Sequence, residues 1–273
     1  MSDLEKRFNV TVRGAGPPTF VFAHGFGCDQ TMWRFMAPHY ADRGRVVCYD
    51  LAGNGGSDLS SYDRNRHGTL AGHADDLIEL ICSLGGDPVV FIGHSVSGMI
   101  GLLAGLRAPE LFASQIWLGP SPCYINDGDY SGGFSREDID SLLETMDSNY
   151  LGWSSNMAPA IMGAPDQPHL ATELTNSFCR TDPEIAKHFA RVTFLSDNRA
   201  DVRQLDIPTL VLQCSDDLIA PRTVGEFLVR TLPRGTLRVI ENVGHCPHLS
   251  SPSESIEAMD EFLATLDSAR GSV

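Results

Sequence analysis

Long hydrophobic runs and basic residues are both scarce in this chain of 273 residues. No apolar run is long enough to span a bilayer, and residues 1–7 lack the basic and then apolar pattern of a secretory signal peptide. Lys and Arg number 20 against 35 Asp and Glu, a formal net charge of -15, and a field of that sign repels phosphate backbones and anionic lipid surfaces. We therefore expect a cytoplasmic protein that has neither a nucleic-acid nor a membrane partner.

Paired cysteine spacings are also absent. The seven cysteines contain no C-x-x-C repeat and form an odd-numbered set, namely Cys28, Cys48, Cys82, Cys123, Cys179, Cys214 and Cys246. Such a set is typical of reduced, mostly buried thiols and not of a disulfide framework. The rest of the composition, with 42% hydrophobic and 20% charged residues, indicates an ordinary globular chain long enough to bury a large core.

Short apolar runs alternate with helical patterns along most of the chain. The runs are nearly continuous, as strands covered on both faces require, and they lie at 19–23, 45–50, 88–93, 114–119, 209–214 and 237–240. Helices are expected between them at 29–40, with Asp29 as N-cap, and at 69–84, 96–107, 221–232 and 253–266. This alternation predicts an α/β fold with a mostly parallel central sheet flanked by helices.

One segment, residues 121–200, breaks the alternation. It contains no convincing strand and carries helical patterns at 135–150, 152–162, 169–179 and 182–195, the first of which opens with the cap signature Ser135-x-x-Asp138. We interpret the segment as a helical cap inserted between two strands, with residues 1–120 and 201–273 forming the core. An independent helical domain is the alternative, and it is less favoured because a sheet strand follows at once at residue 209.

A candidate nucleophile follows the strand at 88–93. The string Gly93-His94-Ser95-Val96-Ser97 places Ser95 on a sharp strand-to-helix turn, where its Oγ is exposed above the sheet. The strict G-x-S-x-G pattern fails at its last position, although Ser97 is small enough to serve the same packing need. Taken alone, the string is as consistent with a simple turn as with a nucleophile.

Two other strand ends supply the groups that such a serine requires. Asp217 follows the strand at 209–214 and His245 follows the strand at 237–240, and the order Ser, Asp, His is that of α/β-hydrolases. A hydroxyl is a weak nucleophile until an imidazole removes its proton, and the imidazole needs a carboxylate to fix its tautomer. We predict that Ser95 attacks, His245 transfers the proton and Asp217 orients the imidazole.

Asp216 is the competing carboxylate, because it stands beside Asp217 in the same loop. The Asp-x-x-x-Pro spacing that ends at Pro221 begins at Asp217, which favours Asp217 over Asp216.

An acyl-transfer site also needs donors for the developing oxyanion, and we expect the backbone amides of Val96 and Phe26 to provide them. A simple strand-ending turn is the alternative interpretation of the loop that contains Phe26.

Metal and phosphate sites are not favoured by the sequence. His245, Cys246 and His248, together with Cys214, suggest zinc only weakly, because no second properly spaced pair exists. The loop at 53–57 is rich in glycine but lacks a lysine and any G-x-G-x-x-G continuation. We therefore expect neither a metal nor a cofactor.

Longer strings carry a family resemblance, and they lie at residues 22–30, 49–53, 93–97, 119–124, 148–153, 213–217 and 244–248. Over its whole length the chain resembles the α/β-hydrolase superfamily. Within it, the strings are similar to those of the RsbQ-like bacterial energy-stress regulators and the related plant karrikin and strigolactone receptors. Cys246 and His248 favour the bacterial group, and Ser97 in place of glycine is shared with the plant receptors.

The resemblance implies a V-shaped cap of four helices above a small, largely apolar pocket that leads to Ser95. The pocket-lining positions in such relatives correspond here to Phe26, Phe134, Trp153, Met157, Phe194 and Ile219. Without the resemblance, the apolar residues of the cap have a simpler interpretation as helix-packing core. The resemblance also implies a small hydrophobic ligand and, in the bacterial case, a PAS-domain phosphatase as partner.

Three functional hypotheses follow. The first is a serine hydrolase that acts on a small hydrophobic ester or lactone, within RsbQ-like stress signalling or small-molecule sensing. The second is a ligand-binding protein that signals through a protein partner with little turnover. The third is a general metabolic carboxylesterase, and fold alone decides none of them, because one scaffold hosts many chemistries.

Overall fold

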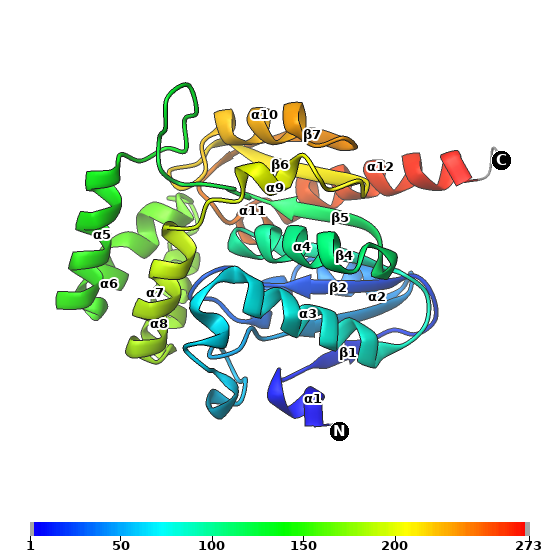
Figure 1. Ribbon diagram of the computed structural model, residues 1–273, viewed down its shortest axis with the longest axis horizontal. Helices are drawn as coiled ribbons and strands as arrows, with labels where there is room; N and C mark the ends of the chain where they lie inside the picture. Colours follow the sequence, from blue (N-terminus) through cyan, green and yellow to red (C-terminus); the bar gives the residue numbers. More distant parts are fainter. Residues whose placement is uncertain (1–2, 271–273) are drawn as a thin grey trace.

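The computed structural model describes residues 3–270 and contains a seven-stranded sheet with helices on both faces (Figure 1). The strands are β1 (Thr11–Arg13), β2 (Thr19–Ala23), β3 (Arg45–Tyr49), β4 (Val89–His94), β5 (Phe112–Leu118), β6 (Thr209–Asp216) and β7 (Gly235–Val243). Their order is β1-β3-β2-β4-β5-β6-β7, and only β1 is antiparallel to its neighbour. Residues 1–2 and 271–273, the two ends of the expected core, lie outside the described residues.

The six strands expected from the apolar runs are confirmed, with small differences at their ends. Every residue of β2 is buried, as is every residue of β4, which agrees with strands that are covered on both faces. The sequence analysis missed β1, because its three residues are all exposed at the edge of the sheet and have no apolar pattern.

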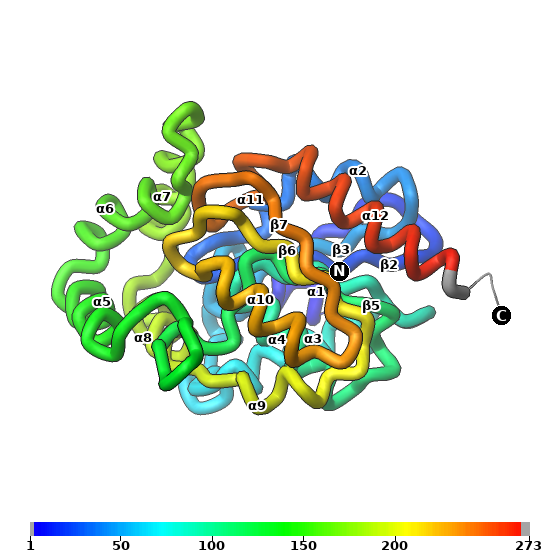
Figure 2. Tube along the Cα trace, turned by 90° about the horizontal axis from the view of Figure 1, so that it is seen from above, coloured from blue at the N-terminus to red at the C-terminus, as the bar shows by residue number. Residues whose placement is uncertain are grey.

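Two helical layers cover the sheet. One face packs against α3 (Leu70–Leu84), α4 (Val96–Arg107) and α10 (Arg222–Thr231), whose apolar residues share one cluster with the strands. The opposite face packs against α2 (Ala37–Ala41) and α12 (Pro252–Arg270), which contribute Tyr40, Met259 and Phe262 to a second cluster. Figure 2 shows these two layers on opposite sides of the strands. The expected sheet flanked by helices is therefore confirmed.

The helix expected over 29–40 is wrong as a single element. A 3-10 helix, η1 (Gln30–Trp33), is followed by a separate short helix, α2, that begins at Ala37. Pro38 lies in the first turn of α2, where its missing N–H costs nothing, whereas within one continuous helix it would remove a hydrogen bond. Asp29 caps η1 as expected, because its side chain accepts a hydrogen bond from the Thr31 amide at 2.9 Å.

Five helices of the described chain stand between β5 and β6, and we call the first four the cap helices: α5 (Arg136–Ser148), α6 (Tyr150–Met162), α7 (Pro168–Arg180) and α8 (Pro183–Phe194). Ser135 and Asp138 form the reciprocal capping box expected at the start of α5. In Figure 1 the arrows of the parallel strands β2 and β5 point towards the cap helices, which stand at that end of the sheet. Residues at the carboxyl ends of the strands therefore face the cap.

Short elements complete the chain, namely α1 (Asp3–Arg7), η2 (Leu59–Ser61), η3 (Arg66–Gly68), η4 (Pro109–Leu111), α9 (Arg199–Val202) and α11 (Pro247–Ser250). None of the helices within residues 3–270 combines the length and the apolarity needed to cross a membrane.

Polar contacts attach α7 to the loop that follows β2. Ser177 Oγ donates to the Gly27 carbonyl at 2.8 Å, and Arg34 makes a two-pronged ion pair with Glu173 at 2.6 and 2.7 Å. Gly27 has φ +67°, and a Cβ at this position would lie 2.4 Å from the Phe178 ring. A glycine is therefore required where the loop and α7 come together.

Candidate active site

Ser95 occupies a strained turn between β4 and α4. Its backbone has φ 55° and ψ -121°, an uncommon conformation for a non-glycine residue, and the side chain is buried. Gly93 allows the helix to approach the strand, since a Cβ there would lie 2.8 Å from the Ser97 carbonyl. Ser97 itself donates its Oγ hydrogen to the His24 carbonyl at 2.5 Å, so the residue that departs from the glycine pattern has a partner of its own.

Three side chains from three strand ends form a continuous hydrogen-bonded chain. His245 Nε2 lies 2.8 Å from Ser95 Oγ, and His245 Nδ1 lies 2.8 Å from Asp217 Oδ2. All three residues are buried, with 4–6% of their surface exposed. The sequence analysis grouped these residues, and the structure brings them together in the geometry that proton transfer from a serine requires.

The side chain of Asp216 is exposed. Only its backbone supports the loop that carries His245, because the Asp216 carbonyl accepts a hydrogen bond from the Gly244 amide at 2.7 Å. Asp217 Oδ1, in contrast, accepts hydrogen bonds from the amides of Ile219 and Ala220 at 2.8 and 3.1 Å. These two bonds fix the carboxylate, so that its other oxygen faces the imidazole. Of the two carboxylates, Asp217 is therefore the one that contacts His245.

Gly119 makes room for the imidazole at the end of β5. A Cβ on Gly119 would lie 3.1 Å from His245 Cε1, and the residue has φ +58°. A side chain at this position would therefore be strained and would also crowd the imidazole ring.

The loop after β2 passes directly over the serine. A Cβ on Gly25 would lie 3.3 Å from Ser95 Cβ, and the Gly25 carbonyl accepts from the Cys28 amide at 3.2 Å, which closes the turn around Phe26. Val96 is the first residue of α4, where a helix leaves its N–H groups without intrahelical acceptors. These positions suit the two amides expected for an oxyanion, and that role stays a prediction.

A narrow cavity opens above Ser95 and His245, both of which line it. Of the residues expected to line the pocket, Phe26, Trp153, Phe194 and Ile219 line this cavity. Phe134 and Met157 do not line it, and for these two the expectation is corrected. Both are partly buried and pack against the hydrophobic cluster of the cap, while backbone hydrogen bonds to Tyr124 and Asn126 hold Phe134 beside the Ile125 segment.

The sequence analysis missed further residues that line the cavity, namely Cys28, His94, Tyr124, Ile161, Leu174, Phe178, Thr193 and Cys246. Tyr124 is the polar group of most interest among them. Burial raises the pKa of its phenol to about 12, and the neighbouring Ser95 side chain opposes the rise. Tyr124 stood within one of the family strings, but nothing in its spacing pointed towards the serine.

His94 precedes the serine and supports the loop that carries His245. Its Nε2 donates to the His245 carbonyl at 2.8 Å, and burial is the main reason why the pKa of His94 is well below its usual range. The neutral ring therefore has its proton on Nε2 and a lone pair on Nδ1.

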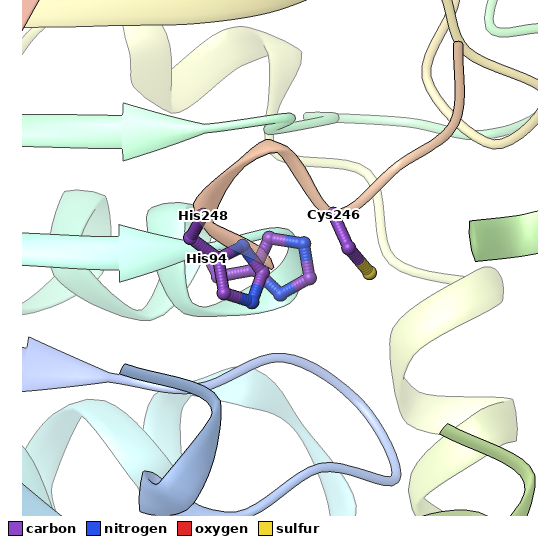
Figure 3. A group of neighbouring side chains, drawn as sticks. All are labelled: His94, Cys246 and His248. Atoms are coloured by element: carbon purple, nitrogen blue, oxygen red, sulfur yellow. The ribbon is translucent and has the colours of Figure 1, made fainter. Parts of the chain in front are cut away.

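Two groups of described residues have the composition of a metal site. One contains His94, Cys246 and His248 (Figure 3), and the other contains His67, His73 and Asp76. The weak zinc pattern in the sequence included Cys214 and His245, and neither belongs to a group. His94, which comes from a distant strand, was not part of that pattern.

Comparison with known proteins identifies the family. The model of the alpha/beta hydrolase family matches residues 20–258. The chain belongs to this family and is an α/β-hydrolase. The hydrolase is 36% identical over 260 residues to "Karrikin insensitive 2 receptor CA" of Petunia hybrida, with 95% of this chain and 96% of the relative covered. It is 38% identical over 253 residues to "Strigolactone esterase D14" of Arabidopsis thaliana, with 92% and 94% covered.

Solved structures agree with this assignment. A hydrolase from Oleispira antarctica superposes on this α/β-hydrolase with a TM-score of 0.93 at 39% sequence identity, and the match covers 96% of each chain. The enol-lactonase from Burkholderia xenovorans superposes with a TM-score of 0.81 at 17% identity, with 93% and 95% of the two chains covered, which shows the shared fold alone.

Proposed function

We propose that this α/β-hydrolase cleaves small hydrophobic carboxylic esters or lactones, with Ser95 as nucleophile. The observation that carries the proposal is the hydrogen-bonded chain from Asp217 through His245 to Ser95, buried beneath a cavity. The esterases among the relatives support the same reaction class, among them "Strigolactone esterase D14".

In the proposed mechanism, Ser95 Oγ attacks the carbonyl carbon of the substrate while His245 Nε2 takes the hydroxyl proton. The amides of Phe26 and Val96 stabilise the negative charge that develops on the carbonyl oxygen. The imidazolium then gives its proton to the departing alcohol, which leaves an acyl group on Ser95. Water, activated by the same imidazole, hydrolyses this acyl group, and Asp217 holds the ring and balances its charge throughout.

The substrate class follows from the lining of the cavity. Aromatic and aliphatic side chains dominate it, with Phe26, Trp153 and Phe194 packed as a group of rings. Such a lining favours a compact apolar acyl or lactone ring and disfavours a charged one.

Steady-state hydrolysis of p-nitrophenyl butyrate tests the proposal. We expect turnover by the parent protein and a loss of several orders of magnitude in kcat for Ser95→Ala and His245→Ala, because these residues act as a unit. Circular dichroism establishes that each variant is folded. Turnover by Ser95→Ala at the parent rate would overturn the assignment.

A sensing role is the second candidate, and one observation favours it: similarity to a protein named as a karrikin receptor extends over 95% of this chain. We propose that hydrolysis is slow and that the bound or acylated state is recognised by a partner. The resemblance to RsbQ-like regulators supports a PAS-domain phosphatase in that position. Binding of such a phosphatase only while a ligand occupies the cavity would distinguish this role from that of a metabolic carboxylesterase.

A further inference from the structure

His94, Cys246 and His248 lie close together (Figure 3), and the His94 ring also neighbours His245, with ring centroids 5.0 Å apart. One potential ligand atom from each of the three lies within 4.8 Å of those of the other two, and all three residues are buried. The two imidazoles are close neighbours, with ring centroids 4.3 Å apart, and Trp33 packs on His248 with centroids 4.8 Å apart. Three soft or borderline donors therefore meet in one buried site.

The donor atoms of this group lack partners. Both nitrogens of His248 and Nδ1 of His94 have no hydrogen-bond partner among the residues that the structure describes. His248 is 0% exposed, so water at the surface does not satisfy it either. A buried polar atom without a partner destabilises the folded chain, so three such atoms in one place call for a ligand.

His94 has the arrangement expected of a metal-binding histidine. Its Nε2–H is bound to the His245 carbonyl at 2.8 Å, which fixes the tautomer with the lone pair on Nδ1. Histidines that bind metals usually donate their other N–H to a carbonyl or carboxylate in this way. Gly25 leaves that nitrogen uncovered, because a Cβ at position 25 would lie 2.5 Å from His94 Nδ1.

We propose that His94, Cys246 and His248 form a binding site for Zn²⁺, with one protein nitrogen from each histidine and the Cys246 sulfur as ligands. Three protein ligands leave a fourth tetrahedral position. Because His94 and Cys246 also line the cavity above Ser95, the fourth position faces that cavity. The ion enters through the cavity, and the Cys246 thiol loses its proton to solvent as the Zn–S bond forms.

The site must contract slightly when the ion binds. Zn–N bonds of about 2.0–2.1 Å and a Zn–S bond of about 2.3 Å place the ligands about 3.3–3.6 Å apart. In Figure 3 the Cys246 side chain lies beside the two rings with its sulfur directed away from them. Since the ligand atoms already lie within 4.8 Å of one another, the contraction that ion binding requires is about 1 Å.

A second group, formed by His67, His73 and Asp76, is less suited to a metal ion. Asp76 is already paired with Arg7 and Arg66, each at 2.6 Å, and with His67 Nε2 at 2.9 Å. Two guanidinium groups on the only carboxylate repel a further cation. This contrast makes the group a useful control.

Zinc binding inhibits hydrolysis in this account. The ion lies between the His245 loop and the cavity, and its fourth position takes water or a substrate oxygen away from Ser95. The site is independent of the nucleophile, so Ser95→Ala retains zinc binding even if the proposed hydrolase activity is absent.

Zinc titration of protein stripped with a chelator tests the site. The exposed thiols Cys82 and Cys179 are first replaced by serine, which removes adventitious ligands. We expect one Zn²⁺ per chain, a near-ultraviolet thiolate-to-cobalt band when Co²⁺ is the probe, and inhibition of ester hydrolysis with the same midpoint. Cys246→Ser and His248→Asn weaken zinc binding at least tenfold, and Cys246→Ser abolishes the band.

Matched controls separate this site from others. Cys214→Ser removes a buried thiol outside the group, and His73→Asn removes a buried imidazole of the other group. Both retain zinc binding and the cobalt band. Stoichiometric binding that survives Cys246→Ser, a band that depends on Cys214, or no binding by the folded parent protein would overturn the proposal. Cys246→Ser is an isosteric change, so the test does not depend on whether His248→Asn folds.

Discussion

The imidazole of His245 and the hydroxyl of Ser95 are separated by 150 positions in the chain, yet His245 Nε2 lies 2.8 Å from Ser95 Oγ. The parallel strands β4 and β7 end at the same edge of the sheet, and their loops bring the two side chains together. The proposed chemistry depends on how the neighbouring residues support this contact.

The choice between adjacent carboxylates predicts a large asymmetry. Asp217→Asn replaces the oxygen that accepts from His245 Nδ1, so the imidazole loses the partner that fixes its tautomer. We expect kcat for a nitrophenyl ester to fall by about 10³–10⁴. Asp216→Asn, at the exposed neighbour, changes kcat less than threefold. A reversed order, with Asp216→Asn as the crippling change, would show that the carboxylates had been assigned wrongly.

Gly119→Ala is expected to reduce activity by displacing the His245 ring. The new methyl group would lie 3.1 Å from His245 Cε1, so the ring moves away from Ser95. Gly128→Ala is a matched control, because Gly128 has φ +56° against +58° for Gly119 and no atom within 4 Å of its Cβ position. Both variants lose about 1–2 kcal/mol of stability from backbone strain. Only Gly119→Ala should lower kcat, by at least tenfold, and equal kinetics for the two variants would contradict this.

Trp153→Phe is expected to enlarge the cavity and alter substrate choice. Trp153 lines the cavity from α6, whereas Leu151 on the same helix is 56% exposed. Each methylene in an apolar pocket contributes about 1–3 kcal/mol to discrimination. The ratio of kcat/KM for a hexanoate ester to that for an acetate ester should rise at least threefold in Trp153→Phe and stay constant in Leu151→Ala. An unchanged ratio in folded Trp153→Phe would mean that the residue is core and not pocket.

Stability is expected to fall in acid because of His73. Burial lowers the pKa of His73 to about 3, although the nearby Asp76 opposes this, so the folded protein keeps the ring neutral. Between pH 3 and the unfolded value near 6.5, the unfolded chain binds a proton that the folded chain does not. The free energy of unfolding therefore declines as the pH falls through this window, by at most about 1.4 kcal/mol per pH unit for this group.

His73→Leu should reduce part of that decline, because it removes the group that the unfolded chain protonates. Both nitrogens of His73 lack partners among the described residues, so an apolar side chain of similar size replaces the ring without the loss of a hydrogen bond. His169→Leu, at an exposed histidine, leaves the decline as in the parent. Melting temperatures measured from pH 7 to pH 4 compare the three proteins. The same pH dependence in His73→Leu and the parent would refute the role of this ring.

Sequence alone predicted the elements whose patterns are local. Buried strands such as β2 are predicted by short apolar runs, and the capping box at Ser135 is predicted by residues only three positions apart. The grouping of Ser95, Asp217 and His245 was also predictable, because parallel strands bring their carboxyl ends to one edge of a sheet. Their catalytic roles remain predictions.

Features that depend on three-dimensional packing were not predictable in the same way. The helical pattern over 29–40 is divided into η1, which ends at Trp33, and α2, which has Pro38 in its first turn, and both elements place a large ring, Trp33 and Tyr40, in the same buried cluster. Phe134 and Tyr124 belong to neighbouring loops, and which of them reaches the cavity follows from backbone pairing between the loops. The contact between His94 and His248 was likewise not predictable, because one residue ends β4 and the other follows β7.

The most direct test of the central claim is intact-protein and peptide mass spectrometry after rapid quenching of the reaction with a nitrophenyl ester. If Ser95 is the nucleophile, the protein gains the mass of one acyl group, peptide mapping places it on Ser95, and the adduct is absent from Ser95→Ala. Its persistence reports how slow deacylation is, which separates a sensor from a metabolic esterase. Product release without any acyl group on Ser95, or an adduct on another residue, would contradict the mechanism.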